Sequence, residues 1–273
     1  MTPLGTNLSP QVIRQGLNTR WLGKQDIHCL EVVESTNSVA KDLACHGAPE
    51  GTIVLAEAQS LGRGRLGRHW VSPYGKGLYL SVILRPEIPP AWGSRITLAA
   101  GVALAEAISE LGIRPELKWP NDIMVGHRKI AGILTEASLE KEGIASVIVG
   151  VGINVNTSEK DFPKSIRGTV SSLRLKAGKP VSRVTLLQQL LGKLEGWYEL
   201  LCQGSFDKIL LAWRKYETIL GRMIEVSLPH SRLFGIAEDL DPDGKLLVRD
   251  KGGQLHRIIV GDVIHCRLQE TKT

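Results

Sequence analysis

The change of pattern at Gly221 constrains the possible folds of this chain more than any other feature of its sequence. Before this residue, segments of helical length and segments of strand length follow one another. After it, only short strands are expected, at 223–227, 233–239, 245–249, 254–260 and 263–268. Asp241-Pro242-Asp243-Gly244 and Lys251-Gly252-Gly253 supply turns between them. We therefore predict an α+β domain over 1–220 and a small all-β barrel over 221–273.

The apolar periodicity of residues 1–220 predicts both strands and helices. Strands are expected at 27–33, 52–58, 77–84, 117–125, 130–137 and 144–155. Helices are expected at 10–23, 35–45, 96–111, 182–202 and 205–220. The polar segment 157–181 contains Pro163, Gly168, Gly178 and Pro180, so we expect a long loop with one short element. Loops of this length are usually functional or mobile.

The composition narrows the class of protein. Hydrophobic residues make up 42% and charged residues 23% of the 273 positions, as in an ordinary globular protein. No apolar run has the length of a membrane span, and no charged start precedes an apolar core as in a secretory signal. The four cysteines show no CxxC spacing, which disfavours a zinc site. We expect a cytoplasmic protein with reduced thiols.

The strongest local motif is the segment Gly62–Trp70, preceded by Gln59. Its alternating glycines allow the backbone to approach a ligand, and its interleaved arginines supply donors for phosphate or carboxylate oxygens. Three of the charges behind the net charge of +6 lie within Gly62–Arg68, which indicates a focused anion site. No apolar helix follows, so a dinucleotide-binding fold fits poorly. Taken alone, the segment is also compatible with a solvated basic loop or an RNA contact.

Three further motifs have weaker signals. The second motif is Lys118-Trp119-Pro120-Asn121-Asp122. In a strand, Lys118 and Trp119 point to opposite faces, so Lys118 could enter a cavity while Trp119 packs on the other side. The alternative is a surface lysine beside a packed tryptophan. Gly150–Asn156 ends a buried strand in paired asparagines, which suit a base edge or ribose but are equally common in turns. Glu34–Asn37 offers hydroxyls and an amide for a neutral polar group, or simply a helix cap.

Together, in this order and spacing, these motifs and Gly132–Glu136 resemble the biotin protein ligase family over about residues 10–268. The resemblance implies a catalytic domain similar to class II aminoacyl-tRNA synthetases, a mixed sheet with flanking helices, followed by an SH3-like barrel. The biotin-binding positions that it implies are Ser35, Thr36, Asn37, Gln59, Arg63, Gly64, Arg65, Lys118 and Tyr79. The nucleotide-binding positions are Gly62, Arg68, Trp70, Asn121 and Asn154.

The activity implied by this resemblance has two steps. ATP and biotin first form biotinyl-AMP with release of pyrophosphate, and biotin then passes to a lysine of a biotin carboxyl carrier protein, a subunit of acetyl-CoA carboxylase. Arg65 and Lys118 are the expected catalytic cations, because both reacting groups of the first step are anions. Mg²⁺ is expected on the phosphates, with Glu136 and Asp122 only as candidate ligands. Segment 60–70 is expected to be disordered when the site is empty and to close over the ligand.

The resemblance also sets expectations for partners. Only 34 residues precede Ser35, which leaves no room for the DNA-binding domain of regulatory members, so we expect no nucleic-acid partner. No membrane partner is expected, and a homodimer is compatible with the family. A lipoate or octanoate ligase is the nearest alternative, but the polar Ser35–Asn37 and Gln59 set and the C-terminal barrel favour biotin. A nucleic-acid binder, suggested by the net charge of +6 and the arginine-rich segment, is the alternative from another class.

Overall fold

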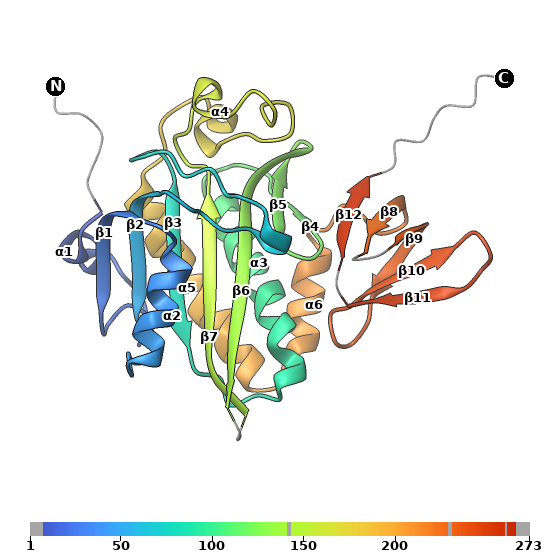
Figure 1. The fold of residues 1–273 in the computed structure, drawn as a ribbon, viewed down its shortest axis with the longest axis horizontal. Coiled ribbons are helices and arrows are strands. Elements are labelled where there is room, and N and C mark those ends of the chain that lie inside the picture. Colours follow the sequence, from blue (N-terminus) through green and yellow to red (C-terminus); the bar gives the residue numbers. More distant parts are fainter. Residues whose placement is uncertain (1–7, 141–142, 229–230, 260, 266–273) are drawn as a thin grey trace.

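The larger part of the molecule is a seven-stranded mixed sheet with helices on both faces (Figure 1). The computed structural model describes residues 8–140, 143–228, 231–259 and 261–265. The strand order is β1-β2-β3-β7-β6-β5-β4; β1 and β2 are parallel and the other neighbours antiparallel. The strands are β1 Ile27–Val33, β2 Ile53–Gln59, β3 Leu78–Leu84, β4 Glu116–Lys118, β5 Asp122–Val125, β6 Arg128–Glu140 and β7 Gly143–Ile153.

The helices cover the two faces of this sheet unequally. Helix α2 lies on one face, where Ala40 and Ala44 pack against Val54, Ile83 and Ile148. Helices α3, α5 and α6 form the layer on the other face (Figure 1). The helices are α1 Pro10–Gln15, α2 Thr36–Cys45, α3 Gly93–Ser109, α4 Leu173–Ala177, α5 Arg183–Cys202 and α6 Phe206–Arg214, and the short 3-10 turns are η1 Arg65–Gly67, η2 Pro90–Trp92 and η3 Glu159–Asp161.

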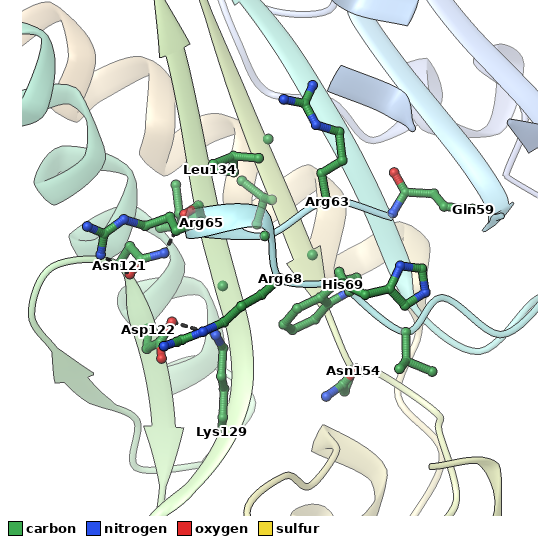
Figure 2. Close-up of a pocket in the computed structure, with 18 of the residues that line it drawn as sticks. Gln59, Arg63, Arg65, Arg68, His69, Asn121, Asp122, Lys129, Leu134 and Asn154 are labelled. Atoms are coloured by element: carbon green, nitrogen blue, oxygen red, sulfur yellow. Dashed lines mark hydrogen bonds and ion pairs between the residues drawn. The ribbon is translucent and has the colours of Figure 1, made fainter. Parts of the chain in front are cut away.

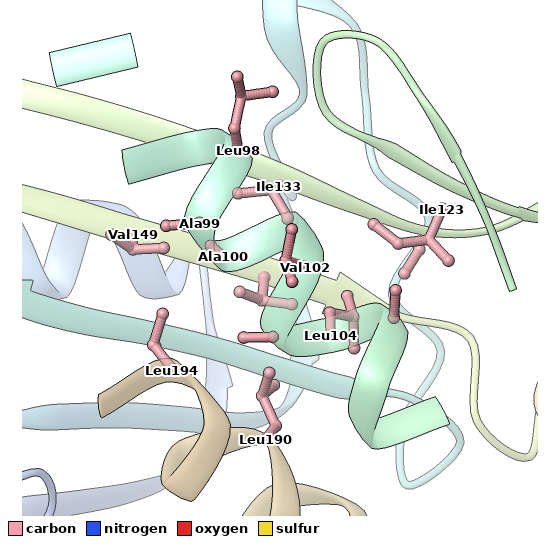
Figure 3. Packing of buried hydrophobic residues seen from close by; sticks show 14 of the residues in the cluster. Leu98, Ala99, Ala100, Val102, Leu104, Ile123, Ile133, Val149, Leu190 and Leu194 are labelled. Atoms are coloured by element: carbon pink, nitrogen blue, oxygen red, sulfur yellow. The ribbon is translucent and has the colours of Figure 1, made fainter. Parts of the chain in front are cut away.

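Helix α3 forms the centre of the main hydrophobic core (Figure 3). It is buried on nearly every side, between the sheet and α5. Its alanines, such as Ala99 and Ala100, have small side chains that let β6 and β7 approach closely. Leu190 and Leu194 of α5 close the core from the other side. The sequence 96–111 was expected to be a buried helix for its alanine and leucine content, and this prediction is confirmed with a start at Gly93.

Three expected elements differ from the structure. The helix expected at 10–23 is only α1, because Gly16 ends it. The strand expected at 117–125 is broken into β4 and β5 at Pro120, whose ring nitrogen cannot donate to a sheet. The helix expected at 205–220 ends at Arg214, and the backbone beyond it follows β4, with Leu117 N–H donating to Tyr216 O. In all three cases a proline, a glycine or a tertiary contact overrides the local apolar pattern.

The C-terminal part is a five-stranded antiparallel sheet in the order β11-β10-β9-β8-β12. Its strands are β8 Met223–Ser227, β9 Arg232–Leu240, β10 Leu246–Asp250, β11 Leu255–Ile258 and β12 Asp262–His265. The expected strands lie close to these positions, although the part of the last one beyond residue 265 falls outside the described residues.

The turn between β9 and β10 joins the two parts of the molecule. Arg95 of α3 forms an ion pair of 2.5 Å with Asp243, and Trp119 Nε1 donates to Gly244 O at 3.1 Å. Gly244 has φ +78, and a Cβ there would lie 2.5 Å from Leu98 Cδ1. A glycine is therefore needed at this joint both for its conformation and for space. Of the helices that the structure describes, none combines the length and apolar character required to cross a bilayer.

Candidate active site

The candidate site is a cavity of about 200 Å³ on the sheet face that carries α2 (Figure 2). The arginine-rich loop after β2 crosses above β6 and β7 and forms one wall. The first turn of α2 and the end of β2 form a second wall, and Phe162, Ile166 and Val170 of the long 157–181 loop contribute a third, apolar wall. The chain therefore brings together segments that are more than a hundred residues apart in the sequence.

A hydrogen-bonded polar network lies at one end of the cavity. The Thr36 backbone N–H donates to Gln59 Oε1 at 2.9 Å, and Gln59 Nε2 donates to Ser72 Oγ at 2.9 Å. The Oγ of Ser81, which is fully buried, lies 2.8 Å from Thr36 Oγ1 and 2.7 Å from Asn37 Oδ1, and its single hydroxyl proton is donated to one of these two acceptors. These bonds hold neutral donors and acceptors in fixed positions, which suits a neutral polar ligand group.

Asn37 links this network to the arginine-rich loop. Its Nδ2 donates to Glu136 Oε2 at 2.8 Å and to Leu134 O at 3.2 Å. The other oxygen of Glu136 accepts from Arg63 at 2.8 Å. A Cβ at Gly150 would collide with the Asn37 amide, so the glycine in β7 leaves room for this side chain. Asn37 thus holds the site together, and its amide is committed to neighbours in this structure.

The arginine-rich loop is a tight turn that closes on itself. Gly64 N–H donates to Arg68 O at 2.7 Å, and Trp70 N–H donates to Gly62 O at 2.8 Å. Gly67 has φ +72, a conformation that favours glycine. Arg65 donates to Asn121 Oδ1 and to Gly261 O of the C-terminal domain, each at 3.3 Å. Arg65 therefore contacts both parts of the molecule.

The cationic part of the cavity lies below this loop (Figure 2). Lys129 Nζ lies 2.6 Å from Asp122 Oδ1 and 5.4 Å from the centre of the Trp70 ring. Gly132 and Gly152 give Lys129 and Trp70 the space they occupy, because a Cβ at Gly152 would lie 2.6 Å from Trp70 Nε1. That indole N–H is buried and has no hydrogen-bond partner among the described residues.

Comparison with known proteins agrees with this geometry. A model of the biotin/lipoate A/B protein ligase family matches residues 29–154, and a model of the biotin protein ligase C terminal domain matches 219–266. The bifunctional ligase/repressor BirA of Bacillus subtilis is 38% identical over 257 residues, which cover 94% of this chain and 78% of that protein. The chain belongs to the biotin/lipoate A/B protein ligase family.

Two further relatives support this assignment. The biotin–[acetyl-CoA-carboxylase] ligase of Mycobacterium tuberculosis is 32% identical, covering 87% of this chain and 89% of that ligase. A solved structure of the biotin protein ligase from Aquifex aeolicus in complex with biotin and ATP aligns with a TM-score of 0.74 at 29% identity, covering 88% of this chain and 97% of that one. The expected fold, a class II synthetase-like domain with an SH3-like barrel, is confirmed for this ligase.

Most of the site residues expected from the sequence lie on the cavity wall of this ligase. These are Ser35, Thr36, Asn37, Gln59, Arg63, Gly64, Arg65, Arg68, Trp70, Asn121 and Asn154. Asn154 is buried, and its Nδ2 donates to Ser171 O at 3.1 Å. The structure brings these residues together, and their individual ligands remain predictions.

Three expected site residues do not lie on this cavity wall, and their roles in binding stay predictions. Gly62 closes the base of the loop, where a Cβ would collide with Trp70 O. Tyr79 packs against Gly77 and donates to Pro73 O at 3.1 Å, and burial raises the pKa of its hydroxyl. Lys118 ends β4 and pairs with Asp122 in the β4–β5 hairpin, but it is not on the cavity wall.

The sequence did not point to Lys129, whose ammonium lies on the cavity wall where we had expected that of Lys118. Lys129 follows the Gly126-His127 turn, so its position in a hairpin resembled an ordinary surface lysine. Asp122 pairs with Gly132 across β5 and β6, which places Lys129 beside Asp122. His69 and the apolar Phe162, Ile166 and Val170 were also missed. The last three lie in the loop whose length had indicated a functional role.

Proposed function

We propose that this ligase activates biotin with ATP to form biotinyl-AMP and transfers biotin to a lysine of a biotin carboxyl carrier protein. The names of its relatives support this activity, as does its similarity to a ligase solved with biotin and ATP. A carrier subunit of acetyl-CoA carboxylase is the acceptor that the M. tuberculosis relative suggests. The expected cytoplasmic location, a homodimer and the absence of a nucleic-acid partner remain predictions.

The observation that carries the proposal is the division of one cavity into two chemical halves. Thr36 and Gln59 form a neutral polar end, which suits the uncharged ureido group of biotin. Arg68 and Lys129 bring positive charge to the other part, which suits a carboxylate next to a phosphate. A ligand with a neutral polar head and an anionic tail fits this order of groups.

In the first step, a carboxylate oxygen attacks the α-phosphorus of ATP and pyrophosphate leaves. Two anions must approach each other, so repulsion contributes to the barrier. Lys129 and the arginine-rich loop offset this repulsion from fixed positions. A preorganised donor of this kind is worth about 3 kcal/mol to the transition state. The adenylate then needs shelter from water, which the loop above the cavity provides.

The expected Mg²⁺ does not have a resident site of its own. Among the described residues no group of three His, Cys, Asp or Glu side chains could hold a metal ion. The two candidate carboxylates already bind cations, Asp122 to Lys129 and Glu136 to Arg63. These residues do not fit a permanent metal centre. We therefore treat Mg²⁺ as part of the nucleotide substrate, coordinated by phosphate oxygens.

An exchange of labelled pyrophosphate into ATP tests the proposal, because it reports the first step without a carrier. We expect exchange that depends on biotin and is at least tenfold slower with lipoate or octanoate at the same concentration. The family model includes lipoate ligases, so this comparison decides between the two substrates. Faster exchange with lipoate than with biotin would assign the ligase to the other substrate.

A further inference from the structure

The oxygen atoms at the polar end of the cavity make more contacts with one another than they have protons to share. Three contacts follow in series: Ser81 Oγ to Asn37 Oδ1 at 2.7 Å, Ser81 Oγ to Thr36 Oγ1 at 2.8 Å, and Thr36 Oγ1 to Gln59 Oε1 at 3.2 Å. Each contact needs one proton to be a hydrogen bond. The two hydroxyls carry one proton each, and the two amide oxygens carry none. One of the three contacts is therefore left without a proton.

The orientation of the Asn37 amide is fixed by two acceptors on its nitrogen side. Asn37 Nδ2 lies 2.8 Å from Glu136 Oε2 and 3.2 Å from Leu134 O. The Glu136 carboxylate, which also pairs with Arg63 at 2.8 Å, and the Leu134 carbonyl can only accept. Both therefore require an N–H of Asn37. The amide oxygen of Asn37 faces Ser81, so the Ser81 hydroxyl donates to it.

The Gln59 amide is fixed in the same way. The Thr36 backbone N–H, which can only donate, lies 2.9 Å from Gln59 Oε1. On the other side, Gln59 Nε2 lies 2.9 Å from Ser72 Oγ, and that hydroxyl also lies 3.2 Å from Trp70 O. Because a carbonyl can only accept, the Ser72 proton goes to Trp70 O and Ser72 accepts from Gln59. The oxygen of Gln59 therefore faces Thr36.

The hydroxyl protons of the series consequently run in one direction. Ser81 donates to Asn37, so the 2.8 Å contact between Thr36 and Ser81 needs the proton of Thr36. The contact left without a proton is the longest one, between Thr36 Oγ1 and Gln59 Oε1, where the repulsion between two oxygens is weakest. Thr36 and Gln59 both line the cavity. Their two oxygens form an acceptor pair that a donor from the cavity completes.

We propose that Ser81 and Glu136 are positioning residues that select a ligand with an N–H group in its neutral head. The proposal rests on the proposed function and extends it to specificity. Neither residue lies on the cavity wall, so both act through the direction of the protons that reach Thr36. A ureido N–H completes the acceptor pair. The alkyl chain of octanoate leaves the same oxygens buried and unpaired, which opposes its binding.

The variant Ser81→Ala tests the middle of the series. Without the Ser81 hydroxyl, the Thr36 proton turns to Gln59 Oε1 and closes the acceptor pair. The probes are stable adenylate analogues, acyl sulfamoyl adenosines with a biotinyl, desthiobiotinyl or octanoyl chain, measured by isothermal titration. The two ureido analogues should bind about tenfold more weakly, and the octanoyl analogue should change by less than about twofold. Ser146→Ala, at a buried serine of β7 away from the cavity wall, should change none of them.

The variant Glu136→Gln tests the series from its other end. The single amide oxygen of the glutamine stays on Arg63, because the guanidinium is the stronger donor. Its nitrogen then faces Asn37 and turns that amide over, so the protons run toward Gln59 and close the acceptor pair. We expect the same loss for the ureido analogues and the same indifference of the octanoyl analogue. Glu140→Gln removes the same charge from an exposed position of β6 and should leave all three affinities unchanged.

The combined variant shows whether the two residues act through one series. With both Ser81→Ala and Glu136→Gln, the affinity for the biotinyl analogue should stay within about twofold of Ser81→Ala alone, because one change already closes the acceptor pair. Multiplied losses would overturn the proposal. Equal weakening of the biotinyl and octanoyl analogues by either single change would also overturn it, since the residues would then only support the fold. A wild-type protein that does not bind the biotinyl analogue would instead overturn the proposed function itself.

Discussion

Lys129 is the single side chain on which the proposed chemistry depends most. It lies half-buried on the cavity wall, against Asp122 and near the face of Trp70. We expect Lys129→Met to lower biotin-dependent pyrophosphate exchange about 100-fold, because a preorganised cation no longer offsets the repulsion between carboxylate and phosphate. Thermal unfolding should change little, since the methionine retains the packing of the stem.

Lys118→Met is the matched control for this substitution, because Lys118 is also a half-buried lysine of the same sheet but is not on the cavity wall. Its exchange rate should stay within tenfold of wild type. A larger loss in Lys118→Met than in Lys129→Met would restore the assignment that the sequence motif had suggested.

A substitution at Gly150 tests whether the hydrogen-bond network around Asn37 shapes the biotin pocket. An added Cβ would collide with the Asn37 amide and displace the network that joins Thr36, Ser81 and Glu136. We expect Gly150→Ala to raise the KM for biotin at least tenfold. Gly168→Ala, where a Cβ meets open space, should leave it unchanged. Equal KM values for the two variants would show that this network does not shape the biotin pocket.

Cys29 provides a test of burial by chemical labelling. Burial, and to a smaller extent the charge of Glu57, raises the pKa of the Cys29 thiol to about 11. Its thiolate fraction at pH 8 is therefore far below that of an ordinary thiol, and iodoacetamide should label exposed Cys45 first, as read by mass spectrometry. The folded state also holds this proton above pH 9, where the unfolded state releases it, so its contribution to stability falls as pH rises through this range.

At the residue scale, the sequence could identify types of side chain but not their pairing. Asn121 and Asp122 of the motif Lys118–Asp122 lie on the cavity wall, and their roles stay predictions. The lysine that reaches the cavity comes from the other side of the β5–β6 hairpin, because Asp122 pairs with Gly132 and brings Lys129 alongside. The pairing register of β5 and β6 is set by the tertiary structure, so it cannot be predicted from a local motif.

Helix α3 is the element whose packing supports the site from behind. Leu104 is fully buried in its centre, against the sheet. Leu104→Ala should lower the free energy of unfolding by about 2–5 kcal/mol, because it removes buried methyl groups and leaves a cavity. Leu211→Ala, at a position with 62% exposure in α6, should change it by less than about 0.5 kcal/mol. Urea unfolding followed by circular dichroism measures both.

The elements themselves were predictable where the local pattern and the tertiary structure agree. Strand β1 was expected at 27–33 and lies there, and α2 begins directly after Ser35 as its capping residues indicated. The prediction failed at 117–125, where Pro120 interrupts an otherwise apolar strand, and at the end of α6. Beyond Arg214 the chain gains more from pairing with β4 than from another helical turn, and only the fold reveals that partner.

At the scale of the whole molecule, the C-terminal domain is part of the site rather than an appendage. Its Gly261 carbonyl accepts from Arg65, and its β9–β10 turn is fixed to Arg95 and Trp119. The sequence placed a small barrel here but left its role open. The structure connects it to the arginine-rich loop, so a displacement of the domain changes the surroundings of Arg65.

The joint at Gly244 makes this coupling measurable. Gly244 and Gly253 both have positive φ values, +78 and +82, but an added Cβ meets Leu98 at 2.5 Å only at Gly244 and open space at Gly253. Both alanine variants therefore carry the same backbone strain, and Gly244→Ala alone forces the turn away from α3. We expect Gly244→Ala to lower pyrophosphate exchange at least fivefold more than Gly253→Ala and to increase cleavage between the domains by a protease. Equal exchange rates in the two variants would mean that the domain does not hold Arg65 in its working position, and that the contact with Gly261 has no part in the first step.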